Sequence, residues 1–298
     1  MGTKDAISSA QKQRLPPMVE IGMTRQKSRT TVSRAALMCV PVMTFPTLAH
    51  TQAPAGPPAD AAEALVRAYP DFLERIAAND IVWKDGTRMP IDDGKGAKGF
   101  DAMLDDPDIK DMFSMQYPLG EKGLAPAINF DPGRTRYLPL FKKMYGDCQA
   151  VGFMSNAASV VWLPSKGGKS VEFTRINGAA AALQKVSDEL DKLPDQFLEY
   201  LRPTQGTYKC RPIAGTNRRS AHGFGIAIDI AATHTHYWLW SEAAPDGRFP
   251  YRNEVPLEIV RIFEQHGFIW GGKWYHYDTM HFEFRPELIA VAKTRSAN

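Results

Sequence analysis

Two histidines and one aspartate are the residues of this sequence whose types and spacing suit metal chemistry. His222 lies in a polar stretch with two glycines, residues 220–225, and Asp229 is the one charged residue of the short apolar run that follows. His281 lies far downstream, three residues after Asp278. A buried carboxylate is costly unless it is paired or binds a metal, and two imidazoles with one carboxylate form a zinc set that leaves the fourth tetrahedral position for water. We therefore predict one catalytic Zn²⁺ ion at His222, Asp229 and His281.

The elements around these residues have to bring them together. The glycines favour a tight loop after His222, and the β-branched run favours a buried strand that contains Asp229. Seven residues separate the two, and odd offsets on a strand point to opposite faces, so the loop must turn His222 back over the strand. Residues 281–284 alternate as a strand, which places His281 and Glu283 on one face. Without the downstream motif, His222 could equally be a loop histidine and Asp229 a strand-end cap.

Both motifs resemble a known family of zinc peptidases. Ser-x-His-x-x-Gly-x-Ala-x-Asp at 220–229 is followed at a distance by an acidic residue, two spacers and His-Phe at 278–282. This arrangement is similar to D-Ala-D-Ala carboxypeptidases and dipeptidases, and to phage and bacterial L-alanyl-D-glutamate endopeptidases. The segment Phe-Ile-Trp-Gly-Gly-Lys-Trp at 268–274 is most like the endopeptidase branch. The resemblance covers roughly the last third of the chain and says little about residues 54–140.

The resemblance implies catalytic roles for two further residues. An acidic residue at the position of Asp278 is the general base of the family, which takes a proton from water and delivers it to the leaving amine. A turn cap is the simpler role for Asp278. An arginine on the strand before the histidine loop implies that Arg211 anchors the substrate or stabilises the oxyanion. A structural ion pair is the alternative for Arg211, and Arg218, Arg219 and the more distant Arg175 compete for its role.

Other polar and aromatic residues complete the predicted cleft. Ser220 is expected to orient the loop and to contact substrate, and no nucleophile motif surrounds it. Trp274 is expected to wall the cleft, although most tryptophans belong to the core. His234 and His236 are interpreted as residues of the surface or the pocket rim, and His276 as a residue that could touch the transition state.

The N-terminal stretch predicts export from the cytoplasm. Four basic residues between 25 and 34 precede an apolar run at 35–48, and Thr-Gln-Ala at 51–53 offers a cleavage point. We expect a signal peptide at 23–53, with residues 1–22 a possible upstream extension; an uncleaved membrane anchor is the alternative. The run is too short for a comfortable membrane span, so no membrane segment is expected in the mature chain. The mature protein would be periplasmic or associated with the cell wall.

The distribution of charge argues against nucleic acid as a partner. The chain has a formal net charge of +3, but residues 1–53 hold seven Lys/Arg and two Asp/Glu, so the rest has a net charge of −2. Without the signal peptide, Cys148 and Cys210 are the only cysteines. In an exported protein they could form a disulfide, although two buried thiols remain an alternative.

Periodicity predicts an α+β fold in which a small antiparallel sheet carries the zinc site, with helices packed on one side and an irregular N-terminal extension. We expect a helical and loop-rich region at 54–145 and a zinc peptidase domain at 146–298. The individual elements are expected as a helix at 62–78, a hairpin of 159–163 with 170–175, a helix carrying 183–193, a strand at 206–214 that includes Arg211, and a helix at 255–266.

These expectations describe an exported zinc peptidase of peptidoglycan stem peptides that cleaves L-alanyl-D-glutamate bonds. A D-Ala-D-Ala carboxypeptidase is the close alternative. A zinc-stabilised cell-wall binding module without catalytic activity is an alternative of a different class, in which Asp278 would be dispensable. A peptidase of ordinary or signalling peptides is a further alternative.

Overall fold

Short helices and strands joined by long loops make up the part of the chain that the computed structural model describes, residues 59–296. The predicted signal peptide at 23–53 and the predicted extension at 1–22 lie outside the described residues. All described residues belong to one compact unit, which spans the boundary predicted at 145/146; the boundary itself stays a prediction. The helices are α1 (Ala59–Ala68), α2 (Phe100–Asp105), α3 (Leu138–Tyr145), α4 (Ala179–Leu190), α5 (Leu198–Leu201), α6 (Leu257–Gln265) and α7 (Pro286–Ser296). The strands are β1 (Leu73–Ala77), β2 (Asp80–Trp83), β3 (Arg88–Pro90), β4 (Ala157–Val161), β5 (Ser170–Thr174), β6 (Ala227–Asp229), β7 (Phe268–Trp270) and β8 (His281–Phe284).

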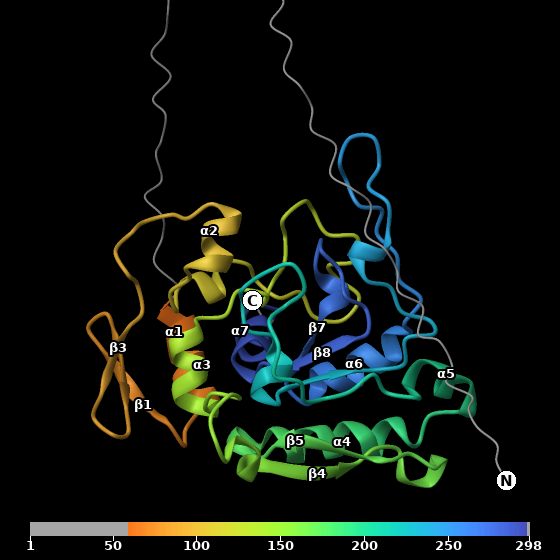
Figure 1. Ribbon diagram of the computed structural model, residues 1–298. Coiled ribbons are helices and arrows are strands. Elements are labelled where there is room, and N and C mark those ends of the chain that lie inside the picture. The colour runs from red at the N-terminus through yellow and green to blue at the C-terminus, as the bar shows by residue number, and fades with distance from the viewer. Residues whose placement is uncertain (1–58, 297–298) are drawn as a thin grey trace, which may run out of the picture. The chain divides into compact units, whose positions relative to one another are not determined.

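The strands form three small antiparallel sheets, which confirms the predicted α+β class (Figure 1). The central sheet has the order β6-β8-β7. In its register Asp229 lies directly opposite His281, and Ile228 lies opposite Phe282. The alternation along β8 therefore puts the polar pair on one face and the aromatic residue on the other.

Amphipathic helices bury their apolar faces against these sheets. The predicted stripe of α4 is buried at Leu183, Val186 and Leu190, and the helix packs on the β4–β5 hairpin (Figure 1). Helix α6 packs on β7, and the Phe263 ring stacks on Phe282 with 3.8 Å between their centroids. Full burial of each such side chain contributes about 1.5–3 kcal/mol. This packing fixes the apolar face of β8 and hence the direction of its polar face.

The helix predicted over 62–78 is wrong in its second half. Helix α1 ends at Ala68, and the chain then turns into strand β1. Pro70 explains the end, because a proline lacks the backbone donor and disfavours the helical conformation of the residue before it. The turn instead lets the residues after it pair with β2.

The strand predicted over 206–214 is also wrong. Between these bounds the structure contains two isolated bridges, Gly206 to Asp229 and Pro212 to Arg219. Gly206 has a φ of 125° and Pro212 has no N–H group, so neither end can sustain a ladder. Arg211 consequently lies on a loop rather than on a strand.

Buried polar contacts tie the N-terminal region to the central sheet. Tyr117 donates to Glu264 at 2.8 Å, and the fully buried Lys273 donates to the same carboxylate at 2.6 Å. The Arg285 guanidinium donates to the Gly133 carbonyl at 2.8 Å. These contacts hold the loop before α3 beside β8, where its arginines reach the site described below.

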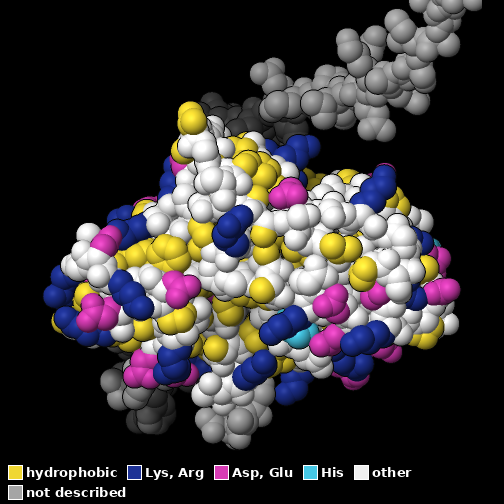
Figure 2. All heavy atoms as spheres, turned by 90° about the horizontal axis from the view of Figure 1, so that it is seen from below, with side chains coloured by type: hydrophobic (Ala, Val, Ile, Leu, Met, Phe, Trp, Pro, Cys, Tyr) yellow, Lys and Arg dark blue, Asp and Glu magenta, His cyan; other side chains and the backbone are white. Residues whose placement is uncertain are grey.

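The outer surface of the described residues mixes both signs of charge on the face seen in Figure 2, where basic, acidic and hydrophobic side chains are interspersed. None of the helices among the described residues combines the length and the apolar composition that a membrane span requires.

Candidate metal centre and active site

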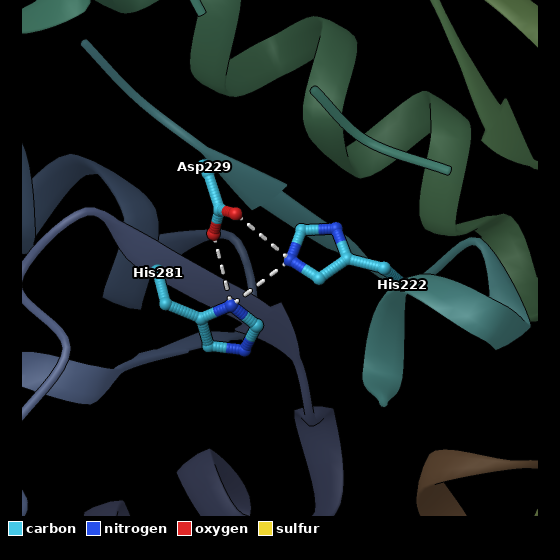
Figure 3. A group of neighbouring side chains, drawn as sticks. All are labelled: His222, Asp229 and His281. Carbon is cyan, nitrogen blue, oxygen red and sulfur yellow. Dashed lines mark hydrogen bonds and ion pairs between the residues drawn. The ribbon is translucent and has the colours of Figure 1, made fainter. Parts of the chain in front are cut away.

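Three side chains converge as the sequence predicts: His222, Asp229 and His281 point toward one another (Figure 3). The Nε2 atom of His222 lies 3.2 Å from Nδ1 of His281 and 3.2 Å from Oδ2 of Asp229, and His281 Nδ1 lies 3.1 Å from Oδ1 of Asp229. Four ligands at roughly 2.0–2.1 Å from a tetrahedral zinc ion lie about 3.3 Å from one another. The two imidazole nitrogens lie at the spacing of two ligands of one zinc ion, and each has a carboxylate oxygen of Asp229 at a similar distance, so these residues fit that ion.

Local structure explains how the three ligands meet. Asp229 and His281 are cross-strand partners of β6 and β8, so their side chains lie on the same face. His222 lies in a 3₁₀ turn, Ala221–Phe224, directly before β6. The turn closes at Gly225, whose φ of 69° is a left-handed conformation that favours glycine, and whose N–H donates to the His222 carbonyl at 3.2 Å. The turn brings His222 back over the strand, as its odd offset from Asp229 requires.

Hydrogen bonds to the far side of each imidazole select the nitrogen that faces the centre. The Nδ1 atom of His222 lies 2.9 Å from the carbonyl of Thr207, which accepts its proton and leaves Nε2 free as a ligand. For His281 the arrangement is reversed, because Nε2 lies 3.5 Å from Oε2 of Glu283 and Nδ1 faces the centre. The alternation of β8 places Glu283 on this face, as expected.

Glu283 is itself held by two arginines. Its side chain is fully buried, and Arg136 donates to it through both Nε, at 2.7 Å, and Nη2. Arg285 lies 3.4 Å from the same carboxylate. Burial would raise the pKa of Glu283, but the attraction of Arg136 outweighs it and holds the pKa well below its ordinary value. The carboxylate behind His281 is therefore charged at neutral pH.

The charges at the centre prepare it for a cation. Burial would raise the pKa of Asp229, but attraction and hydrogen bonds from His222 and His281 hold it well below its ordinary value. In the metal-free protein, burial opposes the charged form of His281, yet its contacts with Asp229 and Glu283 raise its pKa to about 9. Binding of a metal must therefore displace a proton, which makes metal affinity pH-dependent.

A cavity of about 250 Å³ opens beside the three ligands. Every residue that the sequence assigns to the site lies in its wall: the three ligands together with Arg211, Ser220, Trp274 and Asp278. Such a cavity has room for part of a peptide rather than for a whole drug-sized ligand.

Asp278 has an unsatisfied carboxylate. The residue is half-buried, and its Oδ1 atom is enclosed without a hydrogen-bond partner among the described residues. Burial, followed by repulsion from Asp229, raises the pKa of Asp278 to about 6. Its backbone N–H donates to the Gly271 carbonyl at 3.0 Å, and a Cβ on Gly271 would come within 2.6 Å of the Asp278 carbonyl. A carboxylate that is poised near neutral pH in a cavity is suited to proton transfer rather than to a turn cap.

The loop that carries Arg211 is fixed by a disulfide. Cys148 and Cys210 are bonded, with 5.6 Å between their Cα atoms, which settles the alternatives left by the sequence. Arg211 is half-buried and donates to the carbonyl of Pro212 at 3.2 Å, and its own carbonyl accepts from the N–H of Ser220 at 3.2 Å. Its guanidinium has no carboxylate partner among the ion pairs of the described residues, so it remains available to substrate.

The competing residues have other partners. Arg219 lies 3.5 Å from Asp147, and Arg175 donates to a backbone carbonyl at 2.7 Å. His276 lies 2.8 Å from Asp131 and outside the metal cavity. His234 and His236 lie 3.1 and 2.8 Å from the carboxylate of Glu254, and neither lines this cavity.

Two arginines of the cavity wall, Arg134 and Arg136, were not predicted. Arg134 donates to the carbonyl of His276 at 2.7 Å, and its guanidinium lies 5.3 Å from the centroid of the Trp274 ring. Both arginines follow the turn at 131–133, and their i, i+2 spacing is the one local signal they carry. Nothing local connects them with ligands that lie more than eighty residues downstream.

A second group of carboxylates, Asp92, Asp93 and Asp108, has a spacing that could hold a cation. Lysines already neutralise it: Lys110 lies 2.7 Å from Asp92, and Lys98 lies 2.8 Å from Asp93. Its role is to fix the loop before α2.

Comparison with known proteins agrees with the geometry. Residues 214–284 match the family model described as D-alanyl-D-alanine carboxypeptidase. No curated protein and no solved structure matches significantly. The matched segment contains the three candidate ligands and Asp278, whereas Arg134, Arg136 and Arg211 precede it. The match confirms the resemblance of this segment to the zinc peptidoglycan metallopeptidases.

Proposed function

We propose that this protein is a zinc-dependent peptidase that hydrolyses peptidoglycan stem peptides at L-alanyl-D-glutamate bonds. The observation that carries the proposal is the combination of three side chains, whose ligand atoms contact one another at 3.1–3.2 Å, with the unpartnered carboxylate of Asp278 in the same cavity. A module that only bound the cell wall would have no use for an enclosed, unpartnered carboxylate, which costs stability.

His222, Asp229 and His281 would hold the ion. When bound, a zinc ion polarises a carbonyl and makes water a better nucleophile at neutral pH. Asp278 would accept a proton from the attacking water and deliver it to the leaving amine. Its raised pKa, about 6, keeps both states accessible near neutral pH.

The remaining wall would bind the peptide. Arg211 would donate from its planar fork to a carboxylate or to the oxygen that becomes negative during attack. Arg134 is positioned by Trp274 and by the carbonyl of His276, so it offers a second fixed cation. Ser220, which is buried beside His222, would help to fix the loop.

The resemblance of the segment 268–274 to the endopeptidase branch is what favours the endopeptidase, and this segment adjoins the site. It forms β7 and a 3₁₀ turn, and the Gly271 carbonyl of that turn accepts the N–H of Asp278 at 3.0 Å. The description of the matching family model favours a second candidate, a D-Ala-D-Ala carboxypeptidase. The two differ in whether the substrate chain continues beyond the bond that is cut.

We also propose that the protein acts outside the cytoplasm, in the periplasm or at the cell wall. The disulfide between Cys148 and Cys210 supports this location, because disulfides persist in oxidising compartments. The substrate class supports it too, since peptidoglycan lies there.

Digestion of purified muropeptides by the zinc-loaded protein tests the proposal. Mass spectrometry of the products identifies the bond that is cut, and the chelated protein and Asp278→Asn serve as controls. We expect products that end at L-alanine, formed only with zinc and lost in Asp278→Asn. Release of a single D-alanine would select the carboxypeptidase instead. Zinc binding without any cleavage would contradict the proposal.

A further inference from the structure

A second cavity adjoins the metal cavity and is rich in arginine. It has a volume of about 660 Å³ and shares Arg134, Arg136 and Ile213 with the metal cavity. Its other walls come from α2 and from the loop at 215–219. A substrate seated at the metal could therefore extend past the shared arginines into this second space.

Arg218, in the wall of the second cavity, is paired only with an exposed carboxylate in the part of the chain that the structure describes. Its Nε atom is buried and has no hydrogen-bond partner among the described residues. Among the ion pairs of the described residues, its one carboxylate partner is Asp105, whose Oδ1 lies 3.3 Å away and whose side chain is 67% exposed. Burial, together with the nearby Arg134 and Arg136, lowers the pKa of Arg218, whereas Asp105 raises it. The guanidinium is thus crowded by like charge and only loosely paired.

The two shared arginines are held in place by carboxylates that lie outside both cavities. Arg136 binds Glu283, and Arg134 lies 3.6 Å from Asp131. Both arginines line the two cavities, whereas neither carboxylate lines either one. Such a preorganised set loses little side-chain entropy when an anion binds.

We propose that the second cavity binds a carboxylate of the substrate, between Arg218 and the pair of Arg134 and Arg136. This inference rests on the proposed function, and it adds the requirement for a negative charge away from the bond that is cut. Arginine forks match the planar geometry of a carboxylate. In the free protein Arg218 forms an ion pair with Asp105. Because the Asp105 side chain is exposed, this ion pair is weak and a substrate carboxylate can displace it.

Two acidic residues of the same cavity limit the charge of the ligand. Asp101 and Asp105 line the same cavity and would repel a dianion such as a phosphate more than a single carboxylate. The carboxylate could come from the free carboxyl group of the glutamate or from the C-terminus of the stem peptide. Both sources present the same chemistry, and amidation of each in turn distinguishes them.

The test uses a synthetic tetrapeptide that contains an L-alanyl-D-glutamate bond. Four forms are compared: both carboxylates free, each amidated singly, and both amidated. Binding to the zinc-loaded Asp278→Asn protein is measured by calorimetry, and cleavage is measured separately with zinc-loaded protein that retains Asp278. We expect amidation of the recognised carboxylate to weaken binding about tenfold, the effect of one hydrogen-bonded charge pair.

Variants of Arg218 and Asp105 should change the preference for the free carboxylate over its amide in opposite directions. Arg218→Gln should reduce the tenfold preference to nearly none, and Asp105→Asn should tighten binding of the free acid severalfold, because it removes the competing carboxylate. Arg75→Gln is the matched control, since this arginine is exposed on β1 and its ion pair is with its neighbour Glu74. It should leave the preference unchanged.

Binding and cleavage together separate the two proposals. Cleavage of all four forms at equal efficiency, or an undiminished preference in Arg218→Gln, would overturn the carboxylate site and leave the proposed function standing. Tight, Arg218-dependent binding of the free acid without cleavage would support the carboxylate site and overturn the peptidase. Neither binding nor cleavage would overturn both.

Discussion

The enclosed carboxylate of Asp278 should make the metal-free protein less stable than it could be. Burial raises its pKa from 3.8 to about 6, so the charged form is disfavoured in the folded state. This difference corresponds to about 3 kcal/mol at a pH where the group is ionised in both states. Asparagine has nearly the same shape and no charge. Asp278→Asn should therefore stabilise the metal-free protein by up to about 3 kcal/mol, less whatever the open side of the half-buried group retains in solvation.

The effect has a defined dependence on pH. A carboxyl group whose folded pKa is raised binds its proton more tightly in the folded state, so its penalty grows as pH rises through the two pKa values. The advantage of Asp278→Asn should be small below pH 4, roughly half of its maximum at pH 5, and complete above pH 7. A bound cation would favour the charged carboxylate, so excess zinc should reduce the advantage.

Thermal unfolding in the presence of a chelator measures this effect. At pH 8 we expect a rise in Tm of about 6–12 °C for Asp278→Asn, on the scale of 2–4 °C per kcal/mol for a domain of this size. Asp71→Asn, on the exposed turn before β1, is the matched control and should leave the Tm unchanged. A lower or unchanged Tm for Asp278→Asn at pH 8 would refute the reasoning.

Three further changes test the surroundings of the site. Glu283→Gln should weaken zinc binding about 10–100-fold in a chelator competition, because it loosens the ligand imidazole; unchanged affinity would contradict this. Replacing Cys148 and Cys210 by serine should cost about 4 kcal/mol in urea unfolding, from a separation of 62 residues, and equal stability would argue against the link. Gly272→Ala should lower the free energy of unfolding by about 1–3 kcal/mol, because its Cβ would come within 2.1 Å of the Trp270 ring. A variant with the full stability would contradict this and show that the ring can move.

The meeting of His222, Asp229 and His281 could be predicted because these residues lie in two short motifs. The glycine turn and the odd offset from His222 to Asp229 already require His222 to fold back over the strand. The alternation of 281–284 places His281 and Glu283 on one face, and the cross-strand register with Asp229 completes the set. The turn and the alternation are local, whereas the pairing of the two motifs was indicated by their joint resemblance to the peptidase family.

The parts that could not be predicted depend on long-range packing. Arg134 and Arg136 reach the cavity only because buried contacts hold their loop beside β8. No local sequence pattern predicts those contacts. The loop at 206–214 has the composition of a strand, but its one bridge to β6 is at Gly206. The early end of α1 is a different case, because a local signal is present. Pro70 indicates the end of the helix, but the helical spacing of the apolar residues on both sides of it predicts a longer one.

We propose that His222, Asp229 and His281 bind a zinc ion for a reaction in which Asp278 moves the proton. The most direct test is a titration of the peptidase rate with zinc, for the protein with Asp278 and for Asp278→Asn. We expect no rate without zinc, zinc binding by both proteins with a somewhat lower affinity in the variant, and a kcat lowered about 10²–10⁴-fold in the variant at saturating zinc. A variant that retains the full rate, or a rate that persists without zinc, would contradict it.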